Sequence, residues 1–139
     1  MENHTLRLGV MSVLIIEDDP RRIKSFRREL IGVSVTNITT APSAIAWLMD
    51  HTPKLIFLDY DLHEHGTDYK KSGCGGDVAA WMTKQTRRFN MTFVVIHSLN
   101  DDGARRMMQK LQKQGIPVAR MPFVWDRPES MAKLKRAIA

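Results

Sequence analysis

Two pairs of acidic residues in this sequence each follow directly on a run of four apolar residues. Glu17 and Asp18 come after the first run, VLII, and Asp59 and Asp61 follow the second, LIFL. Carboxylates placed this close together repel one another, and a divalent cation relieves the repulsion. Because Mg²⁺ prefers carboxylate oxygens, we expect these four side chains to form a Mg²⁺ site. The alternative is that they are exposed strand-end residues or caps of the helices that follow.

A third apolar run ends in a histidine and a serine. The segment TFVVI is followed by His97 and Ser98, and Asn100 lies two residues further on. A histidine beside a carboxylate cluster is able to protonate a leaving sugar oxygen, although a strand-end histidine is as often a hydrogen-bonded structural residue. His63 and His65 have the spacing of metal ligands, whereas most loop histidines are simply solvated. We therefore take His97 as a candidate general acid and the two loop histidines as candidate contributors.

These residues lie in a regular alternation of strand-like and helix-like segments. Unbroken apolar runs indicate strands that are buried on both faces, as in parallel sheets. Strands are predicted over residues 12–19, 33–39, 54–62, 92–98 and 116–123, and helical stripes over 23–30, 44–49, 78–82, 104–111 and 131–138. The alternation predicts a flavodoxin-like α/β fold, with a five-stranded parallel sheet in the order 2-1-3-4-5 and five helices. In that order the first and third strands are neighbours, so their acidic ends meet at one edge.

The segment over residues 63–76 is long for a connection between a strand and a helix, which predicts a functional or mobile loop. Its glycines, Gly73, Gly75 and Gly76, either give a flexible entry to the next helix or cradle a phosphate at its start. Cys74 lies among them, and we expect no function for it.

The composition fits one domain without a membrane segment. Residues 11–139 are predicted to form that domain after an N-terminal extension over residues 1–10. The single cysteine excludes an intrachain disulfide, and no apolar run approaches the roughly 18 residues of a membrane helix, so we expect a cytoplasmic protein. The net charge of +6 makes nucleic acid a partner worth testing, although solvated helix faces are usually charged.

These segments resemble the receiver domain of two-component response regulators over nearly the whole chain. VLIIEDDP is similar to the receiver's first strand with its metal-binding acids, which implies that role for Glu17 and Asp18. LIFLD is similar to the phosphoacceptor strand, which implies an aspartyl phosphate at Asp59 and a carbonyl metal ligand at Asp61. Ser98 matches the residue that senses the phosphoryl group. The resemblance thus implies a CheY-like fold with Mg²⁺ as cofactor.

The sequence departs from the receiver pattern in two places. The Lys-Pro pair of strand five is replaced by Met-Pro, so the lysine that contacts the phosphoryl group is absent at Met121. We expect Arg120, or Lys70 or Lys71, to supply the missing cation. The long segment over residues 63–76 also has no counterpart in the short receiver loop.

A second resemblance accounts for these departures. LDYDL, GGDVAAW, IHSLNDDGARRM and MPF are similar, in this order, to the receiver-like family predicted to process cyclic phosphates at RNA ends. Its His-Ser-x-Asn hallmark matches His97, Ser98 and Asn100, whereas Tyr60 stands where its Asp-His-Asp hallmark has histidine. The candidate catalytic residues are therefore Asp59, His97 and Ser98, and the candidate phosphate-binding residues are Ser98, Asn100 and Arg120.

Together the motifs predict a Mg²⁺-binding domain that handles a phosphoryl group at Asp59. The favoured hypothesis is a phosphodiesterase that acts on phosphate-bearing ligands such as RNA ends. The competing hypothesis is a stand-alone receiver that a histidine kinase phosphorylates on Asp59, which would make it a signalling switch. The missing strand-five lysine counts against the switch, because that cation stabilises the phosphorylated state. A third alternative is a binding module that uses the helix over residues 104–111 for partners.

Overall fold

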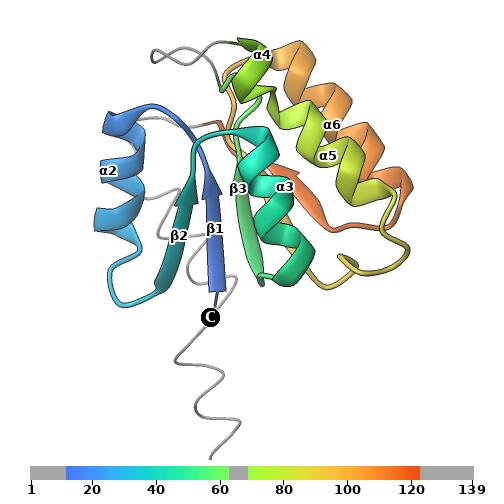
Figure 1. Ribbon diagram of the computed structural model, residues 1–139, viewed down its shortest axis with the longest axis horizontal. Coiled ribbons are helices and arrows are strands. Elements are labelled where there is room, and N and C mark those ends of the chain that lie inside the picture. The colour runs from blue at the N-terminus through green and yellow to red at the C-terminus, as the bar shows by residue number, and fades with distance from the viewer. Residues whose placement is uncertain (1–11, 63–68, 123–139) are drawn as a thin grey trace, which may run out of the picture.

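One parallel sheet forms the middle layer of the protein. The computed structural model describes residues 12–62 and 69–122. The strands are β1 (Ser12–Ile16), β2 (Ser34–Ile38), β3 (Leu55–Leu58), β4 (Phe93–Ile96) and β5 (Val118–Arg120). They are all parallel and lie in the order β2-β1-β3-β4-β5 (Figure 1). The predicted flavodoxin-like topology is therefore confirmed, although β5 is shorter than the predicted strand over residues 116–123.

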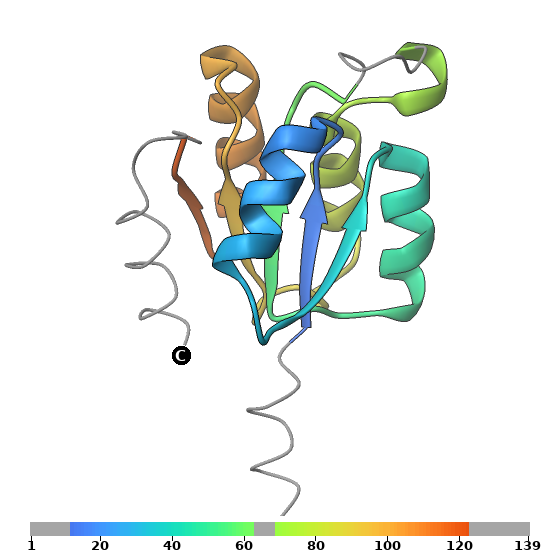
Figure 2. The same ribbon diagram turned by 90° about the vertical axis from the view of Figure 1, so that its left-hand side faces the viewer.

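Helices cover both faces of this sheet. They are α2 (Pro20–Glu29), α3 (Ala41–Asp50), α4 (Tyr69–Ser72), α5 (Gly75–Thr83) and α6 (Asp101–Lys113). α2 packs on one face, whereas α3, α5 and α6 pack on the other (Figures 1 and 2). The helix predicted over residues 131–138 lies outside the described residues. Within the described part of the chain, no helix is long and apolar enough to span a membrane.

Burial on both faces explains why the strand segments contain no polar interruption. Val13 and Ile15 of β1 pack with Phe26 of α2, whereas Ile16 faces the helices of the opposite layer. All four side chains are at most 1% exposed. Ile16 also pairs with Leu58 of β3. The residues that follow these two strands therefore emerge side by side at the same edge of the sheet.

Short polar side chains determine where three helices begin. Asp19, Thr40 and Asn100 are the N-caps of α2, α3 and α6, and each side chain accepts a backbone N–H of the first turn. Pro20 fits the first turn of α2 because a donor at that position has no partner within the helix. α2 therefore starts immediately after the acidic end of β1.

The predicted loop over residues 63–76 is shorter than expected. α4 lies within it, and α5 already begins at Gly75. The Gly75 N–H donates to the Tyr60 carbonyl at 2.7 Å, and a Cβ at Gly75 would collide with the carbonyl oxygen of Asp59. Cys74, expected in a mobile loop, is instead buried at the N-cap of α5. The glycine is thus required because α5 starts in contact with the end of β3.

Replacing Gly75 with alanine should lower the free energy of unfolding by about 2 kcal/mol or more, because the new methyl group must displace the backbone after β3. Urea denaturation measures this loss. Gly32→Ala is the control, since Gly32 has a φ of 85° but open space around it, and we expect it to cost only about 1 kcal/mol. A Gly75→Ala protein as stable as wild type would contradict the close contact.

Candidate functional site

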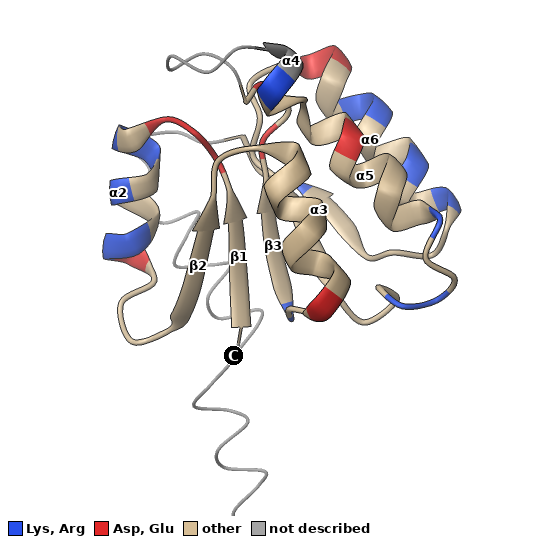
Figure 3. Ribbon diagram, viewed as in Figure 1, with Lys and Arg blue, Asp and Glu red and all other residues tan. Residues whose placement is uncertain are grey.

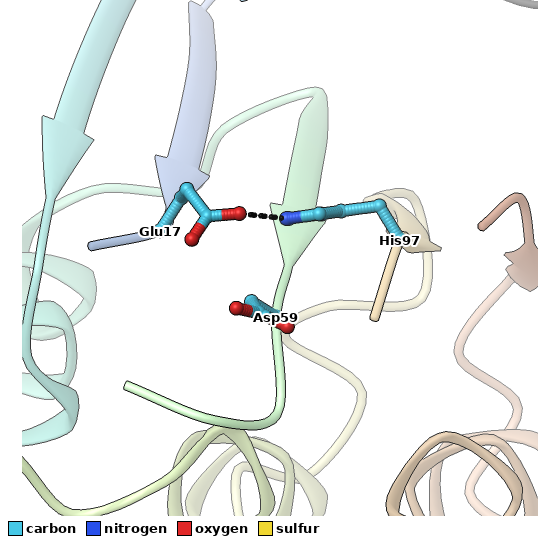
Figure 4. A group of neighbouring side chains, drawn as sticks. All are labelled: Glu17, Asp59 and His97. Atoms are coloured by element: carbon cyan, nitrogen blue, oxygen red, sulfur yellow. Dashed lines mark hydrogen bonds and ion pairs between the residues drawn. The ribbon is translucent and has the colours of Figure 1, made fainter. Parts of the chain in front are cut away.

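Three buried side chains meet at the carboxyl edge of the sheet. Glu17 follows β1, Asp59 follows β3 and His97 follows β4, and one ligand atom of each lies within 4.8 Å of the other two. Figure 4 shows Glu17 and His97 reaching toward each other, with Asp59 beside them. Asp18, the next residue after Glu17, is also buried. The strand order produces this cluster, because β3 lies between β1 and β4.

The Glu17 carboxylate accepts four N–H groups. Its Oε2 accepts the backbone N–H groups of Asp18 and Asp19, both at 3.0 Å. Its Oε1 accepts Nε of Arg22 and Nε2 of His97, both at 2.8 Å. Burial opposes ionisation of this carboxyl, but the donors, His97 foremost, hold the pKa of Glu17 below its ordinary value. Glu17 is therefore ionised and fixed in place.

His97 is oriented by that hydrogen bond and by aromatic packing. Its ring lies edge-on to Phe26, with the centroids 5.0 Å apart, and 6.5 Å from the ring of Phe57. An ionised carboxylate only accepts hydrogen bonds, so Nε2 carries the proton that is shared with Glu17. In this arrangement His97 positions Glu17. Donation of the same proton to another group requires this hydrogen bond to break.

Arg22 is a member of the site that the sequence analysis missed. Its guanidinium lies 2.8 Å from Glu17, 3.7 Å from Asp19 and 3.9 Å from Asp59, and its side chain is 13% exposed. In the sequence Arg22 is one of several basic residues next to one another after β1 and does not stand out. The signal that identifies it is its spacing, because the first turn of a helix that starts directly after β1 lies over the acids at the end of that strand.

The predicted cation of β5 points elsewhere. Nη2 of Arg120 donates to the Ser98 carbonyl at 3.0 Å and to Oδ1 of Asp101 at 2.6 Å. Met121, at the position of the missing lysine, packs against the apolar cluster beneath α2. Lys71 is exposed on α4. Among the described cations of known side-chain position, Arg22 is the one that forms an ion pair with Asp59.

Asp59 holds a proton more tightly than an ordinary carboxyl group. Burial and the negative charge of Glu17 raise its pKa to about 8, and Arg22 and Ser98 offset this only in part. Its Oδ1 accepts the backbone N–H of Tyr60 at 2.9 Å. The site therefore contains two neighbouring carboxyl groups with opposite pKa shifts, an ionised Glu17 and a protonated Asp59 at neutral pH.

Three further predicted site residues contact one another: Ser98, Asn100 and Asp61. Nδ2 of Asn100 donates to Oδ2 of Asp61 at 3.3 Å, and the Asn100 backbone N–H donates to Oγ of Ser98 at 3.1 Å. These contacts join Asp61 and Ser98 to Asn100, the N-cap of α6. The other two predicted contributors, His63 and His65, lie outside the described residues.

The raised pKa of Asp59 predicts that stability falls as the pH rises. The unfolded carboxyl loses its proton near its ordinary pKa of 3.8, whereas the folded one keeps it to about pH 8. Between these values the native state binds more protons, so its stability decreases toward pH 8. Asp59→Asn should remove this dependence and be more stable than wild type at pH 8 by at least about 2 kcal/mol. Urea denaturation in EDTA measures both effects.

Asp50→Asn is the matched control for that experiment, because Asp50 is an exposed acid at the end of α3. It should leave the pH dependence of wild type unchanged. A wild-type protein that becomes more stable between pH 5 and pH 8, relative to Asp59→Asn, would refute the assignment of the proton to Asp59.

Replacing Arg22 with glutamine should raise the pKa of Asp59 further, because a positive charge is removed while the Glu17 charge stays. It should also lower the free energy of unfolding by about 1–3 kcal/mol, since Glu17 loses a charged donor. Carboxyl ¹³C NMR titration reports the pKa directly. The control is Arg21→Gln, whose parent side chain is 78% exposed and should leave the titration unmoved. An unchanged titration in Arg22→Gln would show that Arg22 does not act on Asp59.

Solved receiver domains share this fold. The response regulator protein TrrA from Thermotoga maritima, in complex with Mg²⁺-BeF, matches with a TM-score of 0.65 and 14% identity over 91% of this chain and 98% of that chain. A receiver domain from Methanospirillum hungatei matches with a TM-score of 0.61 and 17% identity over 93% and 94%. The receiver domain of a histidine kinase from Syntrophus aciditrophicus matches with a TM-score of 0.63 and 17% identity over 93% and 89%. At these identities the similarity shows the fold alone.

No curated protein matches the sequence significantly. The sequence profile of the cyclic-phosphate processing receiver domain, however, matches residues 13–113. That span runs from β1 to the end of α6 and includes the whole cluster of Glu17, Asp59 and His97. The chain therefore belongs to the cyclic-phosphate processing receiver domain family.

Proposed function

We propose that this protein hydrolyses cyclic phosphate ends of RNA at a Mg²⁺ site centred on Asp59. The observation that carries the proposal is the meeting of Glu17, Asp59 and His97 within 4.8 Å at the edge of the sheet. A buried histidine, His97, is hydrogen-bonded to the carboxylate of Glu17, which adds an acid–base group to the site. Membership of the cyclic-phosphate processing family supports the same substrate class.

The donor set fits a hard cation. Asp18, Asp59 and Asp61 supply oxygen atoms, which Mg²⁺ prefers, at one edge of the sheet. Glu17 already accepts four N–H groups, so we assign it to the surroundings of the cation and the other three to direct binding. The TrrA neighbour is in complex with Mg²⁺-BeF, which supports Mg²⁺ as the cation. Bound Mg²⁺ would supply positive charge that stabilises the phosphate oxygens.

The attack of water and the protonation of the leaving oxygen are assigned to residues of this chain. Asp59, which would lose its proton on binding Mg²⁺, then acts as a carboxylate: it positions a water molecule and accepts a proton from it as the water oxygen bonds to phosphorus. One ring P–O bond breaks, and the sugar oxygen that leaves takes the Nε2 proton of a cationic His97, whose hydrogen bond to Glu17 breaks and whose ring becomes neutral. Arg22, 3.9 Å from Asp59, supplies the cation that receivers take from strand five. Atoms and charges balance, because one water molecule enters and a phosphate monoester is formed.

The decisive experiment is ³¹P NMR of the protein with Mg²⁺ and a short RNA that ends in a 2′,3′-cyclic phosphate. We expect wild type to convert the cyclic signal into that of a monoester. Asp59→Asn should lower the rate at least about 100-fold, since general-base catalysis contributes on the order of 10²–10⁴-fold. The control is Asp50→Asn, which replaces an exposed acid at the end of α3. This variant should hydrolyse the RNA as fast as wild type.

His97→Gln separates the two functions of the histidine in the same assay. Glutamine retains an N–H donor for Glu17 but has no titrating group. If His97 only positions Glu17, His97→Gln should therefore retain most of the hydrolysis rate and the Mg²⁺ affinity. If His97 is instead the general acid, His97→Gln should lower the rate of hydrolysis and leave the Mg²⁺ affinity unchanged. Undiminished hydrolysis by both Asp59→Asn and His97→Gln would refute the proposed chemistry.

The second candidate function is a phosphorylated switch, which the receiver fold and the Ser98 hydroxyl beside Asp59 favour. A static ³¹P spectrum with RNA, together with an aspartyl phosphate formed from acetyl phosphate and detected by mass spectrometry, would support it. A histidine kinase would then be the partner.

A further inference from the structure

A cavity of about 300 Å³ lies between α5 and α6. Tyr60 forms one end of it, Gly76 and Asp77 line it from α5, and Arg106 and Lys110 line it from α6. Because Tyr60 is the residue after Asp59, the cavity begins one residue from the proposed reaction centre. A ligand that holds a phosphate at Asp59 and extends past Tyr60 would place its next unit in this cavity.

The Tyr60 ring is held firmly at the entrance. A Cβ at Gly103 would collide with the ring, and one at Gly76 would come within 3.2 Å of it, so both glycines leave the room that the ring occupies. Nη2 of Arg106 donates to the Tyr60 hydroxyl at 3.2 Å, and the guanidinium carbon lies 5.7 Å from the ring centroid. The tyrosine thus joins β3 to α6 and orients Arg106 along the cavity.

The cavity carries an excess of positive charge. Arg106 and Lys110 are one helical turn apart, so they share a face of α6, and Figure 3 shows basic residues along this helix. The one acid among the lining residues, Asp77, accepts the Cys74 N–H at 2.9 Å. The acid Asp102 in the first turn of α6 is paired with Arg105. Two like charges on one face repel each other, and an anion between them removes that repulsion.

We propose that this cavity binds the nucleotide unit that precedes the cyclic end of the RNA, with its phosphodiester between Arg106 and Lys110. The inference rests on the proposed function, and it names the substrate as an oligonucleotide in place of a cyclic mononucleotide. Proteins that bind single-stranded nucleic acid combine positively charged side chains with aromatic rings, and this cavity has two cations and the ring of Tyr60.

The test measures binding without turnover. Amide ¹H–¹⁵N NMR gives dissociation constants for a dinucleotide 3′-phosphate and a mononucleotide 3′-phosphate at one salt concentration. Wild type should bind the dinucleotide about tenfold more tightly, with shifts at Gly76 and Lys110 for that ligand only. In Arg106→Gln/Lys110→Gln the ratio of the two constants should fall to about one. In Arg27→Gln/Arg28→Gln, which removes the same charge from exposed positions of α2, the ratio should stay near ten.

Three outcomes would overturn the proposal. They are a wild-type ratio near one, an equal loss in both double variants, and shifts of Gly76 and Lys110 with inorganic phosphate as large as those with the dinucleotide. The last outcome would leave a simple anion site. If wild type prefers the dinucleotide but shows no hydrolysis in the ³¹P assay, the enzymatic function is refuted and the cavity remains a nucleotide site. Failure of the proposed function is thus distinguishable from failure of the cavity proposal.

Discussion

The Glu17 carboxylate is a fully buried charge, and the surrounding structure compensates it completely. A buried carboxylate costs several kcal/mol unless its lone pairs are hydrogen-bonded. Its four N–H donors come from the turn after β1, from α2 and from the end of β4. Because a single carboxylate binds three separate segments, it fixes the start of α2 and the side chain of His97 relative to the sheet. Arg22 and His97 are thereby positioned toward Asp59.

Compensation of Glu17 has a direct effect on its neighbour. The donors that lower the pKa of Glu17 leave Asp59, with fewer donors, to carry the repulsion between the two carboxyl groups. Opposite shifts in adjacent carboxyl groups are typical of sites that assign them different chemical functions. Glu17 is suited to organise the site, whereas Asp59 is suited to exchange a proton for a cation or to accept one from water.

The source of the positive charge distinguishes this chain from the receiver pattern. Receivers place a lysine at the end of strand five, where this chain has Met121 packed into the apolar cluster under α2. Arg22 approaches Asp59 from the first turn of α2 instead. Arg120 is engaged with Asp101 at the start of α6. The cavity with Arg106 and Lys110 lies in the opposite helical layer, between α5 and α6.

The sequence by itself determined the sheet order, the element order and the convergence of the acids, because unbroken apolar runs have few alternatives to central parallel strands. The helix starts at Thr40 and Asn100 are local as well, because each side chain accepts an N–H group from the first turn of its own helix. The helix predicted over residues 131–138 and the roles of the site residues are not tested by the fold. Only the tertiary structure decided that Gly75 is a packing residue, that Arg22 forms an ion pair with Asp59 and that His97 bonds to Glu17. The Arg22 and His97 contacts depend on the direction of a long side chain, and the Gly75 contact depends on the approach of two segments far apart in sequence. The periodicity of apolar residues along the chain predicts neither.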